Sequence, residues 1–363
     1  MEYIFKDVLD IKNGKNQREV ECPDGQYPIY GSGGVMGYAS DYICEADTVI
    51  IGRKGSINNP IYAEEPFWNV DTAFGLCAKK DILLPKYLFY FCIKFDFERL
   101  NRTVTIPSLT KSDLLKIKIQ VPSLDVQQEV IDKLTKIESI LNFRKQELKL
   151  LDELVRGRFV ELFGDPELNP MGWEKVTLND VCSSIVRGPF GSALKKEFFV
   201  EPSETTYKVY EQKHAIQKSA SIGTYYITQE KYRELKRFEC LSGDILMSCS
   251  GTMGELYQLP EGCEKGIINQ ALCKFTLNDK ILPVCFLVYM QQTIGKLETK
   301  GSGIQNIAAV SYIKQMPINL PPMEVQKKFE RFVKQIDKSE LIVQKELDET
   351  QLLFDSLMQE YFG

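Results

Sequence analysis

Two glycine-containing turns carry the polar and basic side chains of this sequence that are best suited to bind phosphates or base edges. Each turn follows a short apolar run, at residues 48–51 and 245–247. Basic side chains can contact phosphates and guanine acceptors, asparagine can pair with adenine, and serine can serve either purpose. The candidates on or beside the turns are Arg53, Lys54, Ser56, Asn58, Asn59, Ser248 and Ser250. A solvated hairpin surface is the competing interpretation of each of them.

Further polar candidates lie in loops upstream of two long helical patterns. Asn101 and Arg102 precede the first pattern, and Ser302 and Gln305 precede the second. Arg187 is a further candidate in the second half of the chain. All of these side chains could approach nucleic acid.

The chain offers no convincing set of catalytic or metal-binding residues. Residues 59–62, Asn-Pro-Ile-Tyr, lack the second proline of the Asn-Pro-Pro-Tyr signature of amino-methyltransferases, and no S-adenosylmethionine loop precedes them. The glycines at 31–34 and 301–303 fit neither nucleotide-binding pattern. One histidine, His214, and ten cysteines without a C-x-x-C pair make a zinc site improbable. We therefore predict no catalytic residue, no metal site and no cofactor bound by this chain.

Composition bounds the class of protein. With 363 residues and 44% apolar content, the chain is long enough for two or three globular domains. The net charge is −5, and the acidic excess falls in segments 122–165 and 321–363, which leaves DNA binding by the remaining segments possible. The longest apolar run, 281–290, is too short to span a bilayer. We expect a cytoplasmic protein with no membrane partner, whose thiols act as small buried side chains.

The sequence repeats itself about 199 positions along the chain. Val121–Gln127 returns as Leu320–Gln326, and Glu161, Phe163 and Gly164 return as Glu360, Phe362 and Gly363. Both copies end in a long helical pattern, which predicts a duplicated architecture with approximate two-fold symmetry.

Apolar residues in both patterns recur by alternating steps of four and three, as in a coiled-coil seam. Arg144 and Arg158 interrupt the first seam, and Glu340 and Thr350 interrupt the second. Helices of about 40 residues would be roughly 60 Å long and need partners to cover their seams. We expect antiparallel pairing through Leu134, Ile137, Leu141, Leu148, Leu151, Val155, Val333, Ile336, Val343, Leu347, Phe354 and Leu357. Packing of each helix on its own domain alone is the alternative.

The remaining segments combine short apolar strands and glycine turns with one helix each, near residues 86–97 and 283–294. We therefore predict an α+β fold with mainly antiparallel sheets. Its expected parts are a first globular domain (1–121), a central helix (122–165), a second globular domain (166–320) and a carboxyl-terminal helix (321–363).

Several stretches, taken in order, resemble the specificity subunit of type I restriction-modification systems. The resemblance covers essentially the whole chain, including its duplication. It is carried by Ile29–Gly34, Gly52–Ser56, Phe67–Ala73, the Val-Pro-x-Leu-x-x-Gln helix start at 121–127, Gly303–Asn306 and Ile318–Pro322. The second half departs from the pattern, because residues 248–252, Ser-Cys-Ser-Gly-Thr, replace the basic turn.

The resemblance implies two target-recognition domains, each contacting one half of an asymmetric, bipartite site in double-stranded DNA. Two antiparallel helices would separate them and dock two modification (methyltransferase) subunits. Those partners would use S-adenosylmethionine, and any restriction (motor-nuclease) subunits would use ATP and Mg²⁺; whether restriction subunits join is left open. The helix length would set the gap between half-sites, with the two domains about one DNA turn apart, roughly 34 Å. The alternatives are a coiled-coil scaffold that binds only proteins and a self-contained methyltransferase.

Overall fold

The computed structural model describes residues 1–101, 107–294 and 310–363, so the candidates Arg102, Ser302 and Gln305 lie outside the described residues. The chain divides into two compact units. Unit 1 comprises Met1–Glu147 and Val343–Gly363, and unit 2 comprises Leu148–Ile342. Each unit is described by itself.

Unit 1 contains a four-stranded antiparallel sheet in the order β2-β8-β5-β6 and a three-stranded sheet in the order β4-β3-β7. A pair of strands, β1 and β9, brings the start of the chain beside residues 118–120. The strands are β1 (Glu2–Ile4), β2 (Leu9–Asn13), β3 (Tyr27–Gly31), β4 (Gly34–Ala39), β5 (Thr48–Gly52), β6 (Ile61–Ala63), β7 (Trp68–Asn69), β8 (Ala73–Ala78) and β9 (Lys118–Gln120). The helices before residue 124 are α1 (Phe5–Val8), α2 (Pro85–Lys94), the 3-10 turn η1 (Phe97–Leu100) and α3 (Lys111–Leu114).

Unit 2 repeats this plan with additions. Its strands β11-β18-β15-β16 correspond in order to β2-β8-β5-β6, and its parallel pair β12 and β17 corresponds to β3 and β7. The strands are β10 (Glu174–Thr177), β11 (Cys182–Arg187), β12 (Thr206–Tyr210), β13 (Tyr226–Thr228), β14 (Glu239–Cys240), β15 (Ile245–Ser248), β16 (Leu256–Gln258), β17 (Gly266–Ile268), β18 (Leu272–Leu277) and β19 (Pro317–Leu320). The shorter helices are α5 (Leu178–Val181), η2 (Gly191–Leu194), η3 (Lys196–Phe198), α6 (Gln212–Ile216), α7 (Gln229–Glu234), η4 (Lys236–Phe238), α8 (Pro283–Ile294) and α9 (Val310–Gln315).

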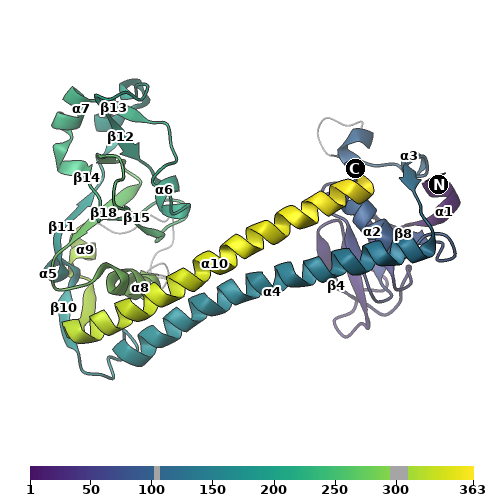
Figure 1. The fold of residues 1–363 in the computed structure, drawn as a ribbon, viewed down its shortest axis with the longest axis horizontal. Coiled ribbons are helices and arrows are strands. Elements are labelled where there is room, and N and C mark those ends of the chain that lie inside the picture. Colours follow the sequence, from purple (N-terminus) through teal and green to yellow (C-terminus); the bar gives the residue numbers. More distant parts are fainter. Residues whose placement is uncertain (102–106, 295–309) are drawn as a thin grey trace. The chain divides into compact units, whose positions relative to one another are not determined.

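The two long helices have equal lengths. Helix α4 spans Leu124–Phe163 and helix α10 spans Met323–Phe362, 40 residues each, and both are continuous (Figure 1). Each begins two residues after a proline, Pro122 or Pro321, and both start inside the segments predicted for them. The boundaries of the four predicted segments, 1–121, 122–165, 166–320 and 321–363, stay predictions.

The helices pack against each other in opposite directions. In unit 1, the core joins Leu134 and Leu141 of α4 to Phe354 and Met358 near the end of α10. In unit 2, the ring of Phe159, near the end of α4, lies 5.5 Å from that of Phe329 near the start of α10. The predicted antiparallel pairing is therefore confirmed, although each helix also packs on the adjoining sheet domain.

Burial along the seam is uneven. The predicted pairing residues Leu134, Ile137, Leu141, Val333, Ile336, Val343 and Phe354 are buried, and Leu148, Leu151, Val155, Leu347 and Leu357 are half-buried.

A buried glutamine fixes the start of each long helix to its sheet domain. Gln127 accepts a hydrogen bond from the Leu84 amide at 2.8 Å and donates to the Ile82 carbonyl at 2.9 Å. Gln326 repeats both contacts with Leu282 and Lys280, at 2.8 and 2.9 Å. Because a buried amide without partners is costly, the paired contacts explain why the same motif begins both helices.

Candidate nucleic-acid interface

In unit 1, three loops converge around the basic turn that follows β5. The Arg53 amide donates to the Thr72 carbonyl at 2.7 Å, and the Leu109 amide donates to the Arg53 carbonyl at 2.9 Å. The Gly55 amide donates to the Pro107 carbonyl at 3.2 Å. Gly55 has a φ of +82°, which favours glycine, so the turn is fixed on both sides by backbone hydrogen bonds.

The side chains of this turn are exposed. Arg53, Lys54, Ser56 and Asn59 all face solvent, and the Arg53 guanidinium lies 5.7 Å from the centre of the Phe74 ring. The guanidinium is therefore supported on an aromatic side chain while remaining open to a ligand. Two cations on a rigid turn can contact phosphates or guanine edges.

Asn58 has a structural role that its sequence position did not suggest. Its side-chain amide donates to the Asp96 carboxylate at 2.9 Å, and its oxygen accepts from the Phe97 amide at 2.7 Å. The hydrogen bond from Asn58 also holds the pKa of Asp96 below its ordinary value. Asn58 thus ties the basic turn to η1, and its contact with a base stays a prediction. The Asn101 side-chain oxygen accepts a hydrogen bond from the Ser108 amide at 3.2 Å.

The corresponding turn of unit 2 has the same backbone and different side chains. The Cys249 amide donates to the Ala271 carbonyl at 2.8 Å, as Arg53 does to Thr72. Cys249 therefore occupies the place of Arg53, and it is buried. The basic contact of the first turn has no counterpart at this position.

The two serines predicted to contact DNA from this turn both form hydrogen bonds within the chain. Ser248 is fully buried, and its hydroxyl accepts from the Glu255 amide at 2.9 Å, so the prediction that it contacts DNA is wrong. Its partner lies on the far side of the hairpin, where sequence spacing gave no signal. Ser250 is half-buried, and its hydroxyl donates to Gln212 of α6 at 3.4 Å. Gln212 also donates to the Ser250 and Thr252 carbonyls, so α6 stabilises the backbone of this turn through hydrogen bonds.

Arg187 ends β11 next to the same turn. Its guanidinium carbon lies 5.7 Å from the centre of the Phe190 ring, which is 73% exposed. Phe190 was missed from the sequence, although an aromatic residue between Gly188-Pro189 and Gly191 is a recognisable signal for an exposed loop aromatic.

His214 is buried and structural. Its Nδ1 accepts from the Glu211 amide at 2.8 Å, and its Nε2 lies 2.7 Å from the Ile222 carbonyl. Burial lowers the pKa of His214, and the accepting Nδ1 requires the neutral ring. Nδ1 thus caps the start of α6, and Nε2 connects the helix to the following loop.

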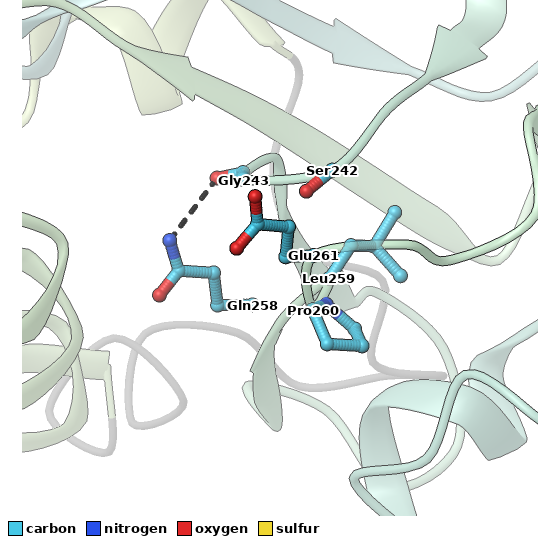
Figure 2. A pocket seen from close by; sticks show the side chains of 6 residues that line it. All are labelled: Ser242, Gly243, Gln258, Leu259, Pro260 and Glu261. Atoms are coloured by element: carbon cyan, nitrogen blue, oxygen red, sulfur yellow. Dashed lines mark hydrogen bonds between the residues drawn. The ribbon is translucent and has the colours of Figure 1, made fainter.

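A hollow in unit 2 lacks the cationic groups that a phosphate site needs. Figure 2 shows a hollow lined by Ser242, Gly243 and Gln258–Glu261, in which Gln258 donates to the Gly243 carbonyl at 3.4 Å. Its only charged lining group is the Glu261 carboxylate, which does not suit a phosphate. Within the described ranges, no cluster of three or more His, Cys, Asp or Glu residues could hold a metal ion. All ten cysteines are free.

The outer faces of the long helices carry exposed apolar side chains at repeated positions. Phe143 and Ile342, 199 residues apart, are 68% and 59% exposed, and Leu154 and Leu353 repeat the pattern at 50% and 52%. Such side chains on a helix whose seam is already covered indicate a surface for partner proteins. No helix in the described part of the chain has the length and apolarity needed to cross a membrane.

Residues 1–152 and 170–350 match the family described as the type I restriction modification DNA specificity domain, and the chain belongs to this family.

Relatives and solved structures agree with this membership. A protein named as a type I restriction enzyme specificity subunit from Haemophilus influenzae is 24% identical over 339 residues, covering 88% of this chain and 81% of that protein. A protein named as the MjaX specificity subunit from Methanocaldococcus jannaschii is 22% identical over 286 residues, covering 76% of this chain and 66% of that protein.

The S subunit of the type I system from M. genitalium has a similar fold, with a TM-score of 0.60, 17% identity and coverage of 100% of this chain and 96% of that one. A structure concerned with complex assembly and conformational transition of the type I R-M system gives a TM-score of 0.61 at 15% identity, covering 100% and 97% of the two chains. These two likenesses establish the fold.

Proposed function

We propose that this chain is the non-catalytic specificity subunit of a type I restriction-modification complex and binds a bipartite, asymmetric DNA sequence. Residues 1–121 contact one half of the sequence and residues 166–320 contact the other. The observation that carries this proposal is a duplicated backbone with different side chains. Arg53 and Cys249 make the same backbone hydrogen bond, yet one presents a cation and the other a buried thiol. Two domains with the same backbone arrangement and different exposed side chains suit two half-sites of different sequence.

The paired helices separate the two recognition domains and dock two modification subunits. The duplicated exposed positions Phe143 and Ile342, and Leu154 and Leu353, support two equivalent docking surfaces. The chemistry belongs to the partners in this proposal. Modification subunits use S-adenosylmethionine, and restriction subunits, where present, use ATP and Mg²⁺.

Affinity comes mainly from phosphate contacts, and the loop clusters supply discrimination of about 1 to 3 kcal/mol per misread base pair. The full chain alone therefore binds DNA weakly, and its complex with a modification subunit binds more tightly. Binding should weaken steeply as salt concentration rises, because each phosphate contact releases counterions.

The test is retardation of duplex DNA by the full chain, alone and with a type I modification subunit, over a range of salt concentrations. An Arg53→Ala, Lys54→Ala variant should bind less tightly and show a shallower salt dependence, by about one unit of slope per lost phosphate contact.

Lys80→Ala is the control. Lys80 is exposed and pairs with Asp47 at 2.8 Å. It lies beyond the end of β8 that is remote from the basic turn, since Ala73 at the other end of β8 pairs with Gly52 beside that turn. The proposal fails if the assembly shows no salt-dependent retardation, or if both variants behave alike. The first of these results, with a stable protein complex, would favour the scaffold that binds only proteins, which the exposed helix faces also suit.

A further inference from the structure

The first recognition domain builds its basic site from two large side chains on neighbouring strands. Arg53 follows β5, and its guanidinium lies over Phe74 of β8. On the other side of β8, Asn13 of β2 pairs with Phe74 in the strand register. Gly14 follows Asn13 and approaches Val70 so closely that an added Cβ would lie 1.8 Å from the Val70 carbonyl oxygen.

The second recognition domain keeps this frame and exchanges the side chains. Cys249 stands at the place of Arg53, since the backbone hydrogen bonds of the two residues correspond. Cys273 stands at the place of Phe74, because Met247 pairs with Cys273 as Ile51 pairs with Phe74. An arginine and a phenylalanine are thus replaced by two small buried thiols, and the neighbouring strand β11 carries a larger side chain at the position paired with Cys273.

Arg187 is that neighbouring side chain. It pairs with Cys273 as Asn13 pairs with Phe74, and it is followed by Gly188, where an added Cβ would lie 1.9 Å from the Asn269 carbonyl oxygen. A hydrogen bond with Cys273 and the nearby charge of Arg187 lower the pKa of the Cys249 thiol, while burial opposes them. The guanidinium therefore lies close to the turn from which the first domain presents Arg53.

Phe190 completes the arrangement. Its exposed ring lies beneath the Arg187 guanidinium, as the Phe74 ring lies beneath that of Arg53. An arginine held on an aromatic face keeps its planar fork of donors in a fixed direction, and this fork matches the two acceptors of a guanine edge.

We propose that Arg187, supported by Phe190, is a base-contacting cation of the second recognition domain and takes the role that Arg53 has in the first. This inference rests on the proposed function. The two domains present a guanidinium at corresponding places but from different strands, so the two arginines approach DNA along different directions. One half-site then contains a guanine contact that depends on Arg187 and not on Arg53.

The test is selection of bound sequences from a randomised duplex library by the full chain with a modification subunit. Arg187→Ala should reduce the preference at one base pair of one half-site by about 5- to 150-fold, which is the range of one bidentate contact. Arg187→Lys keeps the charge and loses the fork, so it should bind with nearly unchanged overall affinity but with the same loss of preference. Arg53→Ala should change the other half-site.

The control is Arg233→Ala, which removes an exposed arginine from α7 and should leave both half-sites unchanged. Thermal unfolding of each variant shows whether it is folded. If Arg187→Ala does not fold, Arg187→Lys alone provides the test. If the wild-type assembly enriches no sequence, the proposed function fails and this inference with it. If the wild type enriches a sequence and both Arg187 variants retain every preference, the inference alone is overturned.

Discussion

The guanidinium of Arg144 on α4 lies 2.5 Å from the carboxylate of Glu346 on α10, and it also contacts Glu147 of its own helix at 2.8 Å. Arg144 interrupts the apolar seam of α4, and its charge is matched by a carboxylate from the facing helix. A polar residue at a seam position, with one fitting partner, favours a single register over neighbouring ones. Arg158 is accommodated differently, since its guanidinium lies 5.6 Å from the Phe332 ring of α10.

We expect Arg144→Glu to destabilise the helix pair, because the new carboxylate would face Glu346. The double variant Arg144→Glu, Glu346→Arg should recover most of the loss, with both differences reduced at high salt. Thermal unfolding at two salt concentrations measures this. Strictly additive effects of the two substitutions would show that the pair does not contribute to register.

Leu134→Ala should lower the free energy of unfolding by roughly 2 to 5 kcal/mol, because Leu134 is fully buried in the core of unit 1 and its loss leaves a cavity. Leu150→Ala is the comparison on the same helix, since Leu150 is 54% exposed and should cost far less. Denaturant unfolding of both variants gives the difference. Equal losses would mean that the seam assignment is wrong.

The exposed apolar positions should control partner docking without affecting folding. Replacement of Phe143 and Leu353 by serine should weaken binding of one modification subunit, and replacement of Leu154 and Ile342 should weaken the other. Native mass spectrometry of the purified assembly counts the bound subunits. Lys345→Ala removes an exposed side chain of α10 and serves as the control. An unchanged count in both serine variants would place the docking surface elsewhere.

Stability should fall below neutral pH through His214. Its pKa is lowered in the folded chain, chiefly by burial, so the neutral form is favoured and its contribution is complete above the unfolded value of about 6.5. As pH falls from there toward the folded value, stability should drop by at most about 1.4 kcal/mol per pH unit. Thermal unfolding between pH 7.5 and 5.5 should show a shallower decline for His214→Gln, which does not titrate. Parallel curves for both proteins would exclude this assignment.

Much of the fold could be predicted from the sequence because its signals are local and duplicated. The apolar periodicity of residues 130–162 and its repeat predicted both long helices, and the Pro122 to Gln127 segment, repeated as Pro321 to Gln326, located their starts. The antiparallel direction was predicted from the order of the segments, since the first helix leads away from the first globular segment and the second follows the other. The buried anchoring contacts of Gln127 did not follow, because its partners near Leu84 are 43 residues away.

The candidate site was less predictable because turn residues were judged by chemical type alone. Ser248 and Asn58 have suitable groups, but their partners Glu255 and Asp96 lie on other loops and occupy them. Conversely, the relation between Arg187 and Cys249 depends on strand register across β18, which sequence spacing does not specify.

The most direct measurement of the central claim is the set of duplex sequences bound by the full assembly. The account predicts two short specified blocks separated by an unspecified gap of fixed length. Duplication of residues 142–148 in α4 together with residues 336–342 in α10 preserves both seams and adds about 10 Å to each helix. The gap should then grow by roughly three base pairs, at 3.4 Å each, with the blocks unchanged. A single continuous block, or a gap that stays the same in the lengthened protein, would contradict the account.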